Sequence, residues 1–321
     1  MSVSLDLLKA FEDCRTGNLK DLKGLVAKGL QLDLTLPFAK IREISCLNAN
    51  MLIVACAYGH LNTVDYLLKN KINVNYREGN GHYALHFAAL ARNNQIIEML
   101  IHKKADVQCK NFQGFTPLHF GCKLGGVESI QSLIKYKALI DSKSYITEAT
   151  PLHVACENKQ FLSAQVLINE NADVNAKTKD LWTPLHYAAQ VNSIPLIEIL
   201  LSHNASVNEV NSSGDLPIHY AAGFRGDALQ ILLNHGSLVN SQNLNGETPL
   251  MIAAGVGNVQ GVNLLLQFGA DVNLISAKKQ SALHRAVQSQ SVEIVQILLK
   301  EGARTNITDV YGNTPLSKAK T

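Results

Sequence analysis

The chain has 321 residues, of which 46% are hydrophobic and 17% are charged, and its formal net charge is +3 at pH 7. This hydrophobic content suits a folded core, and the weak charge lacks the basic footprint of nucleic-acid binding proteins. No apolar run approaches the roughly 18 residues of a membrane span, and the first residues lack a signal-peptide pattern. We therefore expect a cytoplasmic protein, with the nucleus as an alternative, that does not insert into membranes or bind nucleic acid.

The first 49 residues differ in pattern from the rest of the chain. Residues 5–29 carry apolar side chains at helical spacing in two short stretches, separated at Gly17 and Asn18. This pattern predicts a pair of helices. The segment from about 30 to 50 contains Pro37 and lacks the turn glycine of later segments, so we predict an inserted loop there. The loop is either a tolerated surface insertion or a binding loop.

From residue 50 onward the chain repeats one motif. It reads TPLHYAA at 183–189, and recognisable copies begin at 83, 116, 150, 183, 216, 248, 281 and 314, which are 32 to 34 residues apart. Where a copy begins with Thr-Pro, the threonine is expected to cap the first helix with its hydroxyl, and the proline suits the first helical position. A second helix with an apolar leucine pair and a projecting hairpin complete the unit.

The residue that follows each second helix changes along the chain. We expect this position to be left-handed, a conformation that glycine adopts without strain, asparagine tolerates, and lysine adopts at a cost of about 1 kcal/mol. It is occupied by Lys71, Lys104, Lys137, Asn171, Asn204, Gly236, Gly269 and Gly302. We therefore predict that the N-terminal half is less stable than the C-terminal half.

A period of 33 residues with the signature TPLHxA resembles that of the ankyrin repeat family. The resemblance implies an all-α ankyrin-repeat solenoid, in which helix-turn-helix-hairpin units stack in a curved array. We interpret residues 1–49 as a degenerate N-terminal capping repeat with its inserted loop, and residues 50–313 as eight repeats. Residues 314–321 begin a C-terminal repeat. Its abrupt end favours truncation of a longer protein, and a frayed natural end is the alternative.

Catalytic and metal-binding motifs are missing from the sequence. Neither a nucleophile elbow, nor a phosphate-binding loop, nor a zinc-protease motif is found. Histidine recurs in six copies of the signature, and the family resemblance implies that these side chains hold neighbouring hairpin turns together. We therefore expect no catalytic residues, no metal and no cofactor, and the chain is predicted not to be an enzyme.

Positions that do not recur are available to recognise a partner. In ankyrin relatives, partners usually contact hairpin tips and the exposed face of the first helix. The candidate tip residues are Tyr76, Arg77, Phe112, Gln113, Phe115, Tyr145, Leu181 and Trp182, and the candidate first-helix residues are Tyr58, Leu124, Phe224 and Arg225. Beyond these the tips are expected to be polar. The alternative for Phe115 and Trp182 is that they fold onto neighbouring hairpins.

These observations predict a monomeric, non-catalytic scaffold that binds a partner protein or peptide through hairpin tips and a concave inner-helix face. The alternative is a targeting or adaptor region of a larger protein, such as an enzyme, a channel, a ubiquitin-ligase substrate receptor or a pathogen effector. The family resemblance also implies possible hydroxylation by an asparaginyl hydroxylase at Asn175, and more weakly at Asn273. The alternative for both asparagines is turn stabilisation.

Overall fold

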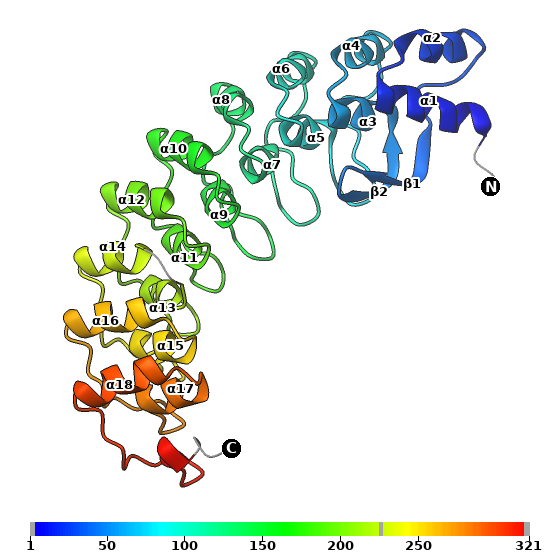
Figure 1. Ribbon diagram of the computed structural model, residues 1–321. Helices are drawn as coiled ribbons and strands as arrows, with labels where there is room; N and C mark the ends of the chain where they lie inside the picture. The colour runs from blue at the N-terminus through cyan, green and yellow to red at the C-terminus, as the bar shows by residue number, and fades with distance from the viewer. Residues whose placement is uncertain (1–3, 225–226, 318–321) are drawn as a thin grey trace. The chain divides into compact units, whose positions relative to one another are not determined.

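The computed structural model describes residues 4–224 and 227–317 (Figure 1). In this part of the chain, helices follow one another in pairs, and the only strands form one two-stranded sheet. Among the described residues, no helix combines the length and apolar character needed to cross a membrane. The fold is therefore an all-α solenoid of repeated helix pairs with one added hairpin.

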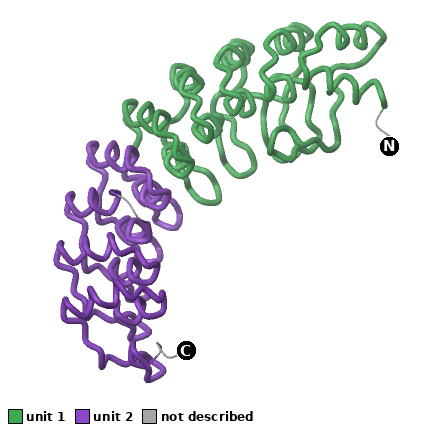
Figure 2. The backbone as a smooth tube through the Cα atoms, viewed as in Figure 1, with its two compact units in different colours: residues 1–173 green, residues 174–321 purple. Residues whose placement is uncertain are grey.

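The chain divides into two compact units, residues 1–173 and 174–321 (Figure 2). The first unit contains α1 (Leu5–Thr16), α2 (Leu19–Ala27), β1 (Thr35–Ile41), β2 (Ile44–Asn50), α3 (Met51–Tyr58), α4 (Leu61–Lys69), α5 (Ala84–Leu90), α6 (Asn94–His102), α7 (Pro117–Lys123), α8 (Val127–Lys135), α9 (Pro151–Glu157) and α10 (Phe161–Asn169). The second contains α11 (Pro184–Gln190), α12 (Ile194–Ser202), α13 (Pro217–Ala222), α14 (Ala228–Asn234), α15 (Pro249–Gly255), α16 (Val259–Gln267), α17 (Ala282–Gln288) and α18 (Val292–Lys300).

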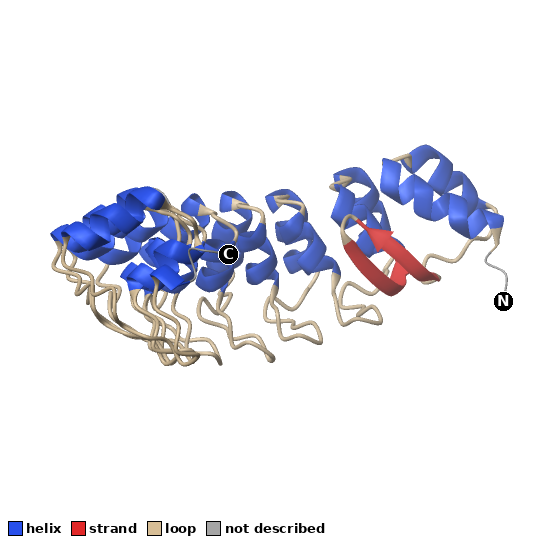
Figure 3. Ribbon diagram, turned by 60° about the horizontal axis from the view of Figure 1, so that its bottom comes forward, coloured by secondary structure: helices blue, strands red, loops and turns tan. Residues whose placement is uncertain are grey.

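The two helices of a repeat have different environments. Residues 51–57 of α3 are all buried, whereas α4 buries only Thr63, Val64, Leu67 and Leu68. Within the first unit the first helices α1, α3, α5, α7 and α9 pack side by side, and α4, α6, α8 and α10 form a second row. The buried first helix explains why small alanine and cysteine side chains recur there, because neighbouring helices pack on both of its sides. Hairpin loops project beyond the first helices (Figure 3).

The inserted segment is a β-hairpin, which corrects the prediction of a loop at about 30–50. β1 and β2 pair antiparallel from Thr35 opposite Asn50 to Ile41 opposite Ile44. A two-residue turn connects them, and Arg42 in this turn has a φ of 52°. Sequence reasoning missed the hairpin because the turn lacks the glycine or asparagine that usually marks this geometry, and because Pro37 interrupts the first strand.

Glu78, in the loop that precedes α5, connects this loop to the hairpin. One carboxylate oxygen of Glu78 accepts from the main-chain N–H of Leu47 at 2.8 Å, and the other accepts from His82 Nδ1 at 2.7 Å. The main-chain N–H groups of Asn80 and His82 also donate to it, each at 2.9 Å. Burial raises the pKa of Glu78 by favouring the neutral acid, but the hydrogen bonds to its carboxylate together lower the pKa by more. The pKa of Glu78 therefore lies below its ordinary value.

The predicted left-handed backbone conformation at the residue after each second helix is confirmed. φ is 62° to 70° at Lys71, Lys104 and Lys137, and 83° to 85° at the glycines of the last three repeats. A Cβ added to Gly269 would meet nothing within 4 Å, so a side chain there would cost only the backbone strain. The three lysines therefore hold strained conformations that glycine would relieve.

We expect Lys104→Gly to stabilise the first unit by about 1 kcal/mol, because glycine adopts positive φ without strain. Hydrogen–deuterium exchange of α5 to α8 should slow accordingly. The matched control is Gly269→Lys, which should destabilise the second unit by a similar amount. Unchanged exchange in both variants would contradict this account of the left-handed position.

Candidate partner-binding surface

Each hairpin tip is shaped by one side chain at its base. Asn111 Oδ1 accepts from the main-chain N–H groups of Gln113 and Phe115, at 3.0 and 2.9 Å. Asn211 and Asn243 make the same pair of bonds in the second unit. An Asx side chain that satisfies two loop N–H groups fixes the loop conformation. The tips are therefore ordered loops with defined side-chain directions.

Successive tips in the first unit are also bonded to each other. The main-chain N–H of Phe112 donates to the carbonyl of Asn80 at 3.4 Å, and that of Tyr145 donates to Gln113 at 2.8 Å. This approach requires glycine, because a Cβ at Gly81 would lie 2.5 Å from the Phe112 nitrogen. Gly114 faces Tyr145 in the same way. The main chain of the aromatic residue of each tip therefore packs directly against the glycine of the preceding tip.

Phe112 and Tyr145 are the most exposed aromatic residues of this row of tips. Their exposed fractions are 56% and 64%. Arg77 lies over the Phe112 ring at 4.9 Å, and Lys110 lies over the Tyr145 ring at 5.0 Å. A cation over an aromatic face is favourable by about 0.5–1 kcal/mol at exposed sites. The two tips therefore present aromatic surfaces, each bordered by a positive charge.

Phe115 and Trp182 lie in more protected positions than Phe112, and their rings contact residues of first helices, whereas the alternative for them was contact with neighbouring hairpins. Both are half-buried. The Phe115 ring meets His119 edge-on at 5.3 Å. In the second unit, the Trp182 ring packs against Tyr187 and Tyr220 at 5.0 and 4.7 Å. These contacts give both side chains a packing role within the scaffold.

The other candidate tip residues vary in exposure. Tyr76 is half-buried, and its hydroxyl donates to the carbonyl of Asn48 at 2.6 Å. Gln113 is exposed beside Phe112. Leu181 is 43% exposed and has a φ of 60°. Of these, Tyr76 supports the inserted hairpin, and Gln113 and Leu181 face solvent.

The candidate residues at the ends of the first helices differ in their exposure. Tyr58 is half-buried near the turn of the inserted hairpin, where Arg42 donates to the carbonyl of Ala57 at 2.6 Å. Leu124 in the first unit and Phe224 in the second are each 41% exposed. Arg225 lies outside the described residues.

The sequence analysis did not predict the exposed apolar residues at the tips of the second unit. The expectation that these tips are polar was wrong. Leu244 is 76% exposed, Val310 is 51% exposed and Tyr311 is 79% exposed. The main-chain N–H of Leu244 donates to Ser213 at 3.0 Å, and that of Val310 donates to Lys278 at 3.2 Å. Leu244 and Val310 thus occupy the same position as Phe112 and Tyr145. Counting the period from Phe112 would have found them.

The recurring histidines connect each repeat to the next. In His119, Nδ1 accepts from both the main-chain N–H and the hydroxyl of Thr116, at 3.0 and 2.9 Å. The opposite nitrogen, Nε2, then donates to a carbonyl of the following repeat. These Nε2 bonds join His86, His119, His186, His219 and His284 to the carbonyls of Phe115, Ala149, Asp215, Ser241 and Asn313 at 2.9, 3.0, 3.0, 3.2 and 3.2 Å.

This arrangement corrects the expected role of the threonine. Where the signature has both a hydroxyl and a histidine, at Thr116, Thr150, Thr183 and Ser281, the hydroxyl pairs with the imidazole instead of capping the helix. Met251 replaces histidine in one repeat, and there Thr248 does cap, because its hydroxyl accepts from the Met251 N–H at 3.2 Å. The imidazole therefore takes the place of the helix N–H as the partner of the hydroxyl in these four repeats.

Burial holds the bridging histidines His86, His119, His186 and His219 in their neutral form. Burial lowers the pKa of His86 to about 3 and the pKa values of His119 and His186 to about 4. Burial also raises the pKa of the thiols of Cys14 and Cys46 to about 12, which leaves them unreactive. Within residues 4–224 and 227–317, no three histidine, cysteine or acidic side chains are grouped as metal ligands would be.

A second ladder runs through the turns that follow the second helices. Asn175 Nδ2 donates to the carbonyl of Asn204 at 3.2 Å, and its Oδ1 accepts from the N–H of Ser206 at 2.8 Å. Asn273 makes the equivalent bonds to Gly302 and Arg304, at 3.2 and 2.9 Å. Both amides proposed for hydroxylation therefore contribute to turn structure.

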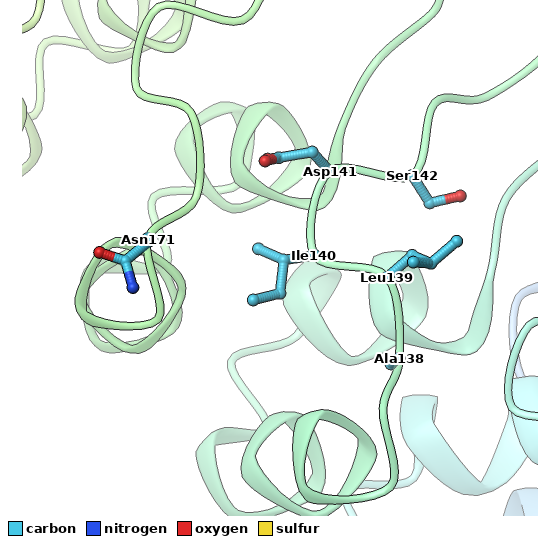
Figure 4. A pocket seen from close by; sticks show the side chains of 6 residues that line it. All are labelled: Ala138, Leu139, Ile140, Asp141, Ser142 and Asn171. Carbon is cyan, nitrogen blue, oxygen red and sulfur yellow. The ribbon is translucent and has the colours of Figure 1, made fainter.

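The amide ladder is interrupted at Asp141. Its carboxylate accepts from the N–H of Asp173 at 3.2 Å, but it has no amide to donate to the carbonyl of Asn171. Burial, and then the charge of Asp173, raise the pKa of Asp141, although the Asp173 N–H opposes this. A shallow pocket of about 470 Å³ opens here, with Ile140 between the two segments (Figure 4). Its lining consists of Ala138, Leu139, Ile140, Asp141, Ser142 and Asn171.

The low pKa values of the histidines predict acid sensitivity. A histidine that is neutral when folded takes up a proton on unfolding, so each contributes stability that is complete above pH 6.5 and is lost towards pH 4. The loss is about 1.4 kcal/mol per pH unit for each residue. We expect the urea midpoint to fall between pH 6.5 and 5, a range in which most carboxylates stay ionised.

The matched control is His119→Gln, which should be less stable at pH 7.5 but should show a weaker dependence on pH. A urea midpoint that stays constant from pH 7.5 to 5 would contradict the assignment of neutral bridging histidines.

Comparison with known families agrees with this geometry. The family model described as ankyrin repeats (3 copies) matches residues 14–111, 51–144, 104–178, 152–243, 185–276 and 218–309. The matches overlap and together extend over most of the sequence. No curated protein matches the chain.

Proposed function

Because the chain belongs to the ankyrin repeat family, we propose that it is a non-catalytic module that binds a partner protein or an extended peptide. Ankyrin repeats are generally protein-interaction modules. The proposed binding surface consists of the hairpin tips of the first unit and includes the exposed Leu124 at the C-terminal end of α7. The second unit offers its own surface at Leu181, Phe224 and Leu244.

One observation carries the proposal: Phe112 and Tyr145 stand exposed at equivalent positions of consecutive tips. Large exposed aromatic side chains beside an arginine or lysine are the residues that dominate protein interfaces. Their cations, Arg77 and Lys110, add positive charge to the surface. The partner segment is therefore expected to combine apolar side chains with acidic ones.

The mechanism is the presentation of side chains that are already ordered. Both aromatic residues belong to backbone that is bonded to the preceding tip, as Tyr145 N–H is to Gln113. Binding then requires little further ordering of the loop, which otherwise costs about 0.5–1.5 kcal/mol for each immobilised side chain. Affinity arises from burying the rings and pairing the cations.

We expect the double variant Phe112→Ala and Tyr145→Ala to lose partner capture, because hot-spot residues contribute about 2 kcal/mol each, or about thirtyfold in affinity. Affinity capture with mass spectrometry would compare this variant with the wild type. The melting temperature should hardly change, since both side chains are exposed.

Trp182→Ala is the matched control, because the Trp182 ring packs against Tyr187 and Tyr220 and its removal should lower the melting temperature. If the double variant captures the same proteins as the wild type, the tips of the first unit are not the binding surface.

A further inference from the structure

The outer edge of β1 carries main-chain groups that point away from the hairpin. In a two-residue hairpin the residues flanking the turn, Ile41 and Ile44, form the closing hydrogen-bonded pair. The alternation along an antiparallel pair then directs the N–H and C=O groups of Phe38 and Lys40 outward. Across residues 4–224 and 227–317, no residue outside the hairpin donates to or accepts from these groups.

The opposite edge of the same hairpin shows what such outward groups bind. The outward carbonyl of Leu47 accepts from the N–H of Gly79 at 2.6 Å, and its N–H donates to Glu78 at 2.8 Å. The carbonyl of Ser45 accepts from the side chain of Asn80 at 2.7 Å. One edge of the hairpin is thus occupied by the chain itself, whereas the β1 edge is open.

Pro37 does not protect the open edge. Proline usually shields an edge strand by placing its ring where a strand would add. Pro37 lies opposite Asn48, at a position whose N–H would have pointed inward to β2. The ring therefore removes a bond inside the hairpin, and the carbonyl of Asn48 instead accepts from Tyr76. The outward N–H groups of Phe38 and Lys40 remain available.

The side chains along this edge favour a particular partner. Phe38 and Leu47 form a cross-strand pair that is 65% and 42% exposed. Lys40 lies two residues from Phe38 on the same face, and the one ion pair that it makes within the described residues is with the exposed Glu43, at 3.6 Å. Exposed pairs of this kind contribute little, so Lys40 can bind another carboxylate. Cross-strand pairing favours an apolar residue opposite Phe38 and an acidic residue opposite Lys40.

We propose that the β1 edge binds an extended acidic segment of a partner protein as an added strand. The segment places an apolar side chain opposite Phe38 and a carboxylate opposite Lys40. Main-chain bonds to β1 supply affinity, and these two side chains supply specificity. The site is separate from Phe112 and Tyr145, so it does not depend on the function proposed for the tips.

The test uses a synthetic peptide with the core Glu-Thr-Ile-Thr-Glu, which places a carboxylate two residues from the isoleucine in either strand direction. Fluorescence anisotropy should show saturable binding, and hydrogen–deuterium exchange of residues 35–41 should slow. A peptide with lysine in place of both glutamates should bind at least about tenfold more weakly, because like charges are then opposed at Lys40.

Two variants at one position separate the main-chain bond from the charge. Lys40→Ala keeps the outward N–H and should weaken binding about threefold, whereas Lys40→Pro also removes this N–H and should weaken it at least about tenfold. Neither change breaks a bond of the hairpin, because the Lys40 N–H points outward. The Phe112→Ala variant should bind the peptide as the wild type does.

Charge reversal keeps the proposal testable even if Lys40→Pro disturbs folding. Lys40→Glu should prefer the lysine peptide over the glutamate peptide. The proposal is overturned if binding of the glutamate peptide is absent or insensitive to these variants. It is also overturned if the free protein self-associates through β1, detected as a concentration-dependent dimer that Lys40→Glu abolishes, since a second copy would then be the occupant.

Discussion

The structure depends on hydrogen bonds that cross from one repeat to the next. A projecting loop exposes main-chain groups that its own repeat cannot satisfy, and buried groups of this kind must be paired. Here the imidazole of a histidine such as His119 reaches the carbonyl of Ala149, and an amide such as Asn175 reaches the carbonyl of Asn204. Each repeat therefore completes the polar bonding of its neighbour, which makes loop conformation a property of the stack.

Residues that depart from the repeat pattern show how these hydrogen bonds depend on one another. Met251 removes the imidazole, and the threonine hydroxyl then caps its helix. Asp141 interrupts the amide ladder, and a shallow pocket borders it. Glu78 replaces the asparagine that shapes other tips, and its longer side chain also holds the N–H of Leu47. In each case one residue that departs from the repeat changes the hydrogen bonds around it, which shows what the residue at the regular position does.

The sequence predicted the parts of the fold that a period reveals. The helix pairs and the left-handed turn at Lys104 follow from copies that can be compared, and the bridging histidines were implied by the resemblance to the ankyrin repeat family. The β-hairpin could not be predicted, because it occurs once and its Arg42 turn lacks the usual residues. The directions of the tip side chains also could not be predicted from the sequence, since Phe115 and Trp182 pack against neighbouring rings. Leu244, in contrast, is exposed at a position that the repeat period could have identified.

The central claim is that the tips are rigid although they lie at the surface, so that their side chains are ordered before a partner arrives. Hydrogen–deuterium exchange at the main-chain N–H groups of Tyr145 and Leu244, which donate to the preceding tips, tests it most directly. The account predicts exchange at least about a hundredfold slower than in an unstructured peptide. Exchange of both groups at the unstructured rate would show that the tips are mobile loops and would contradict it.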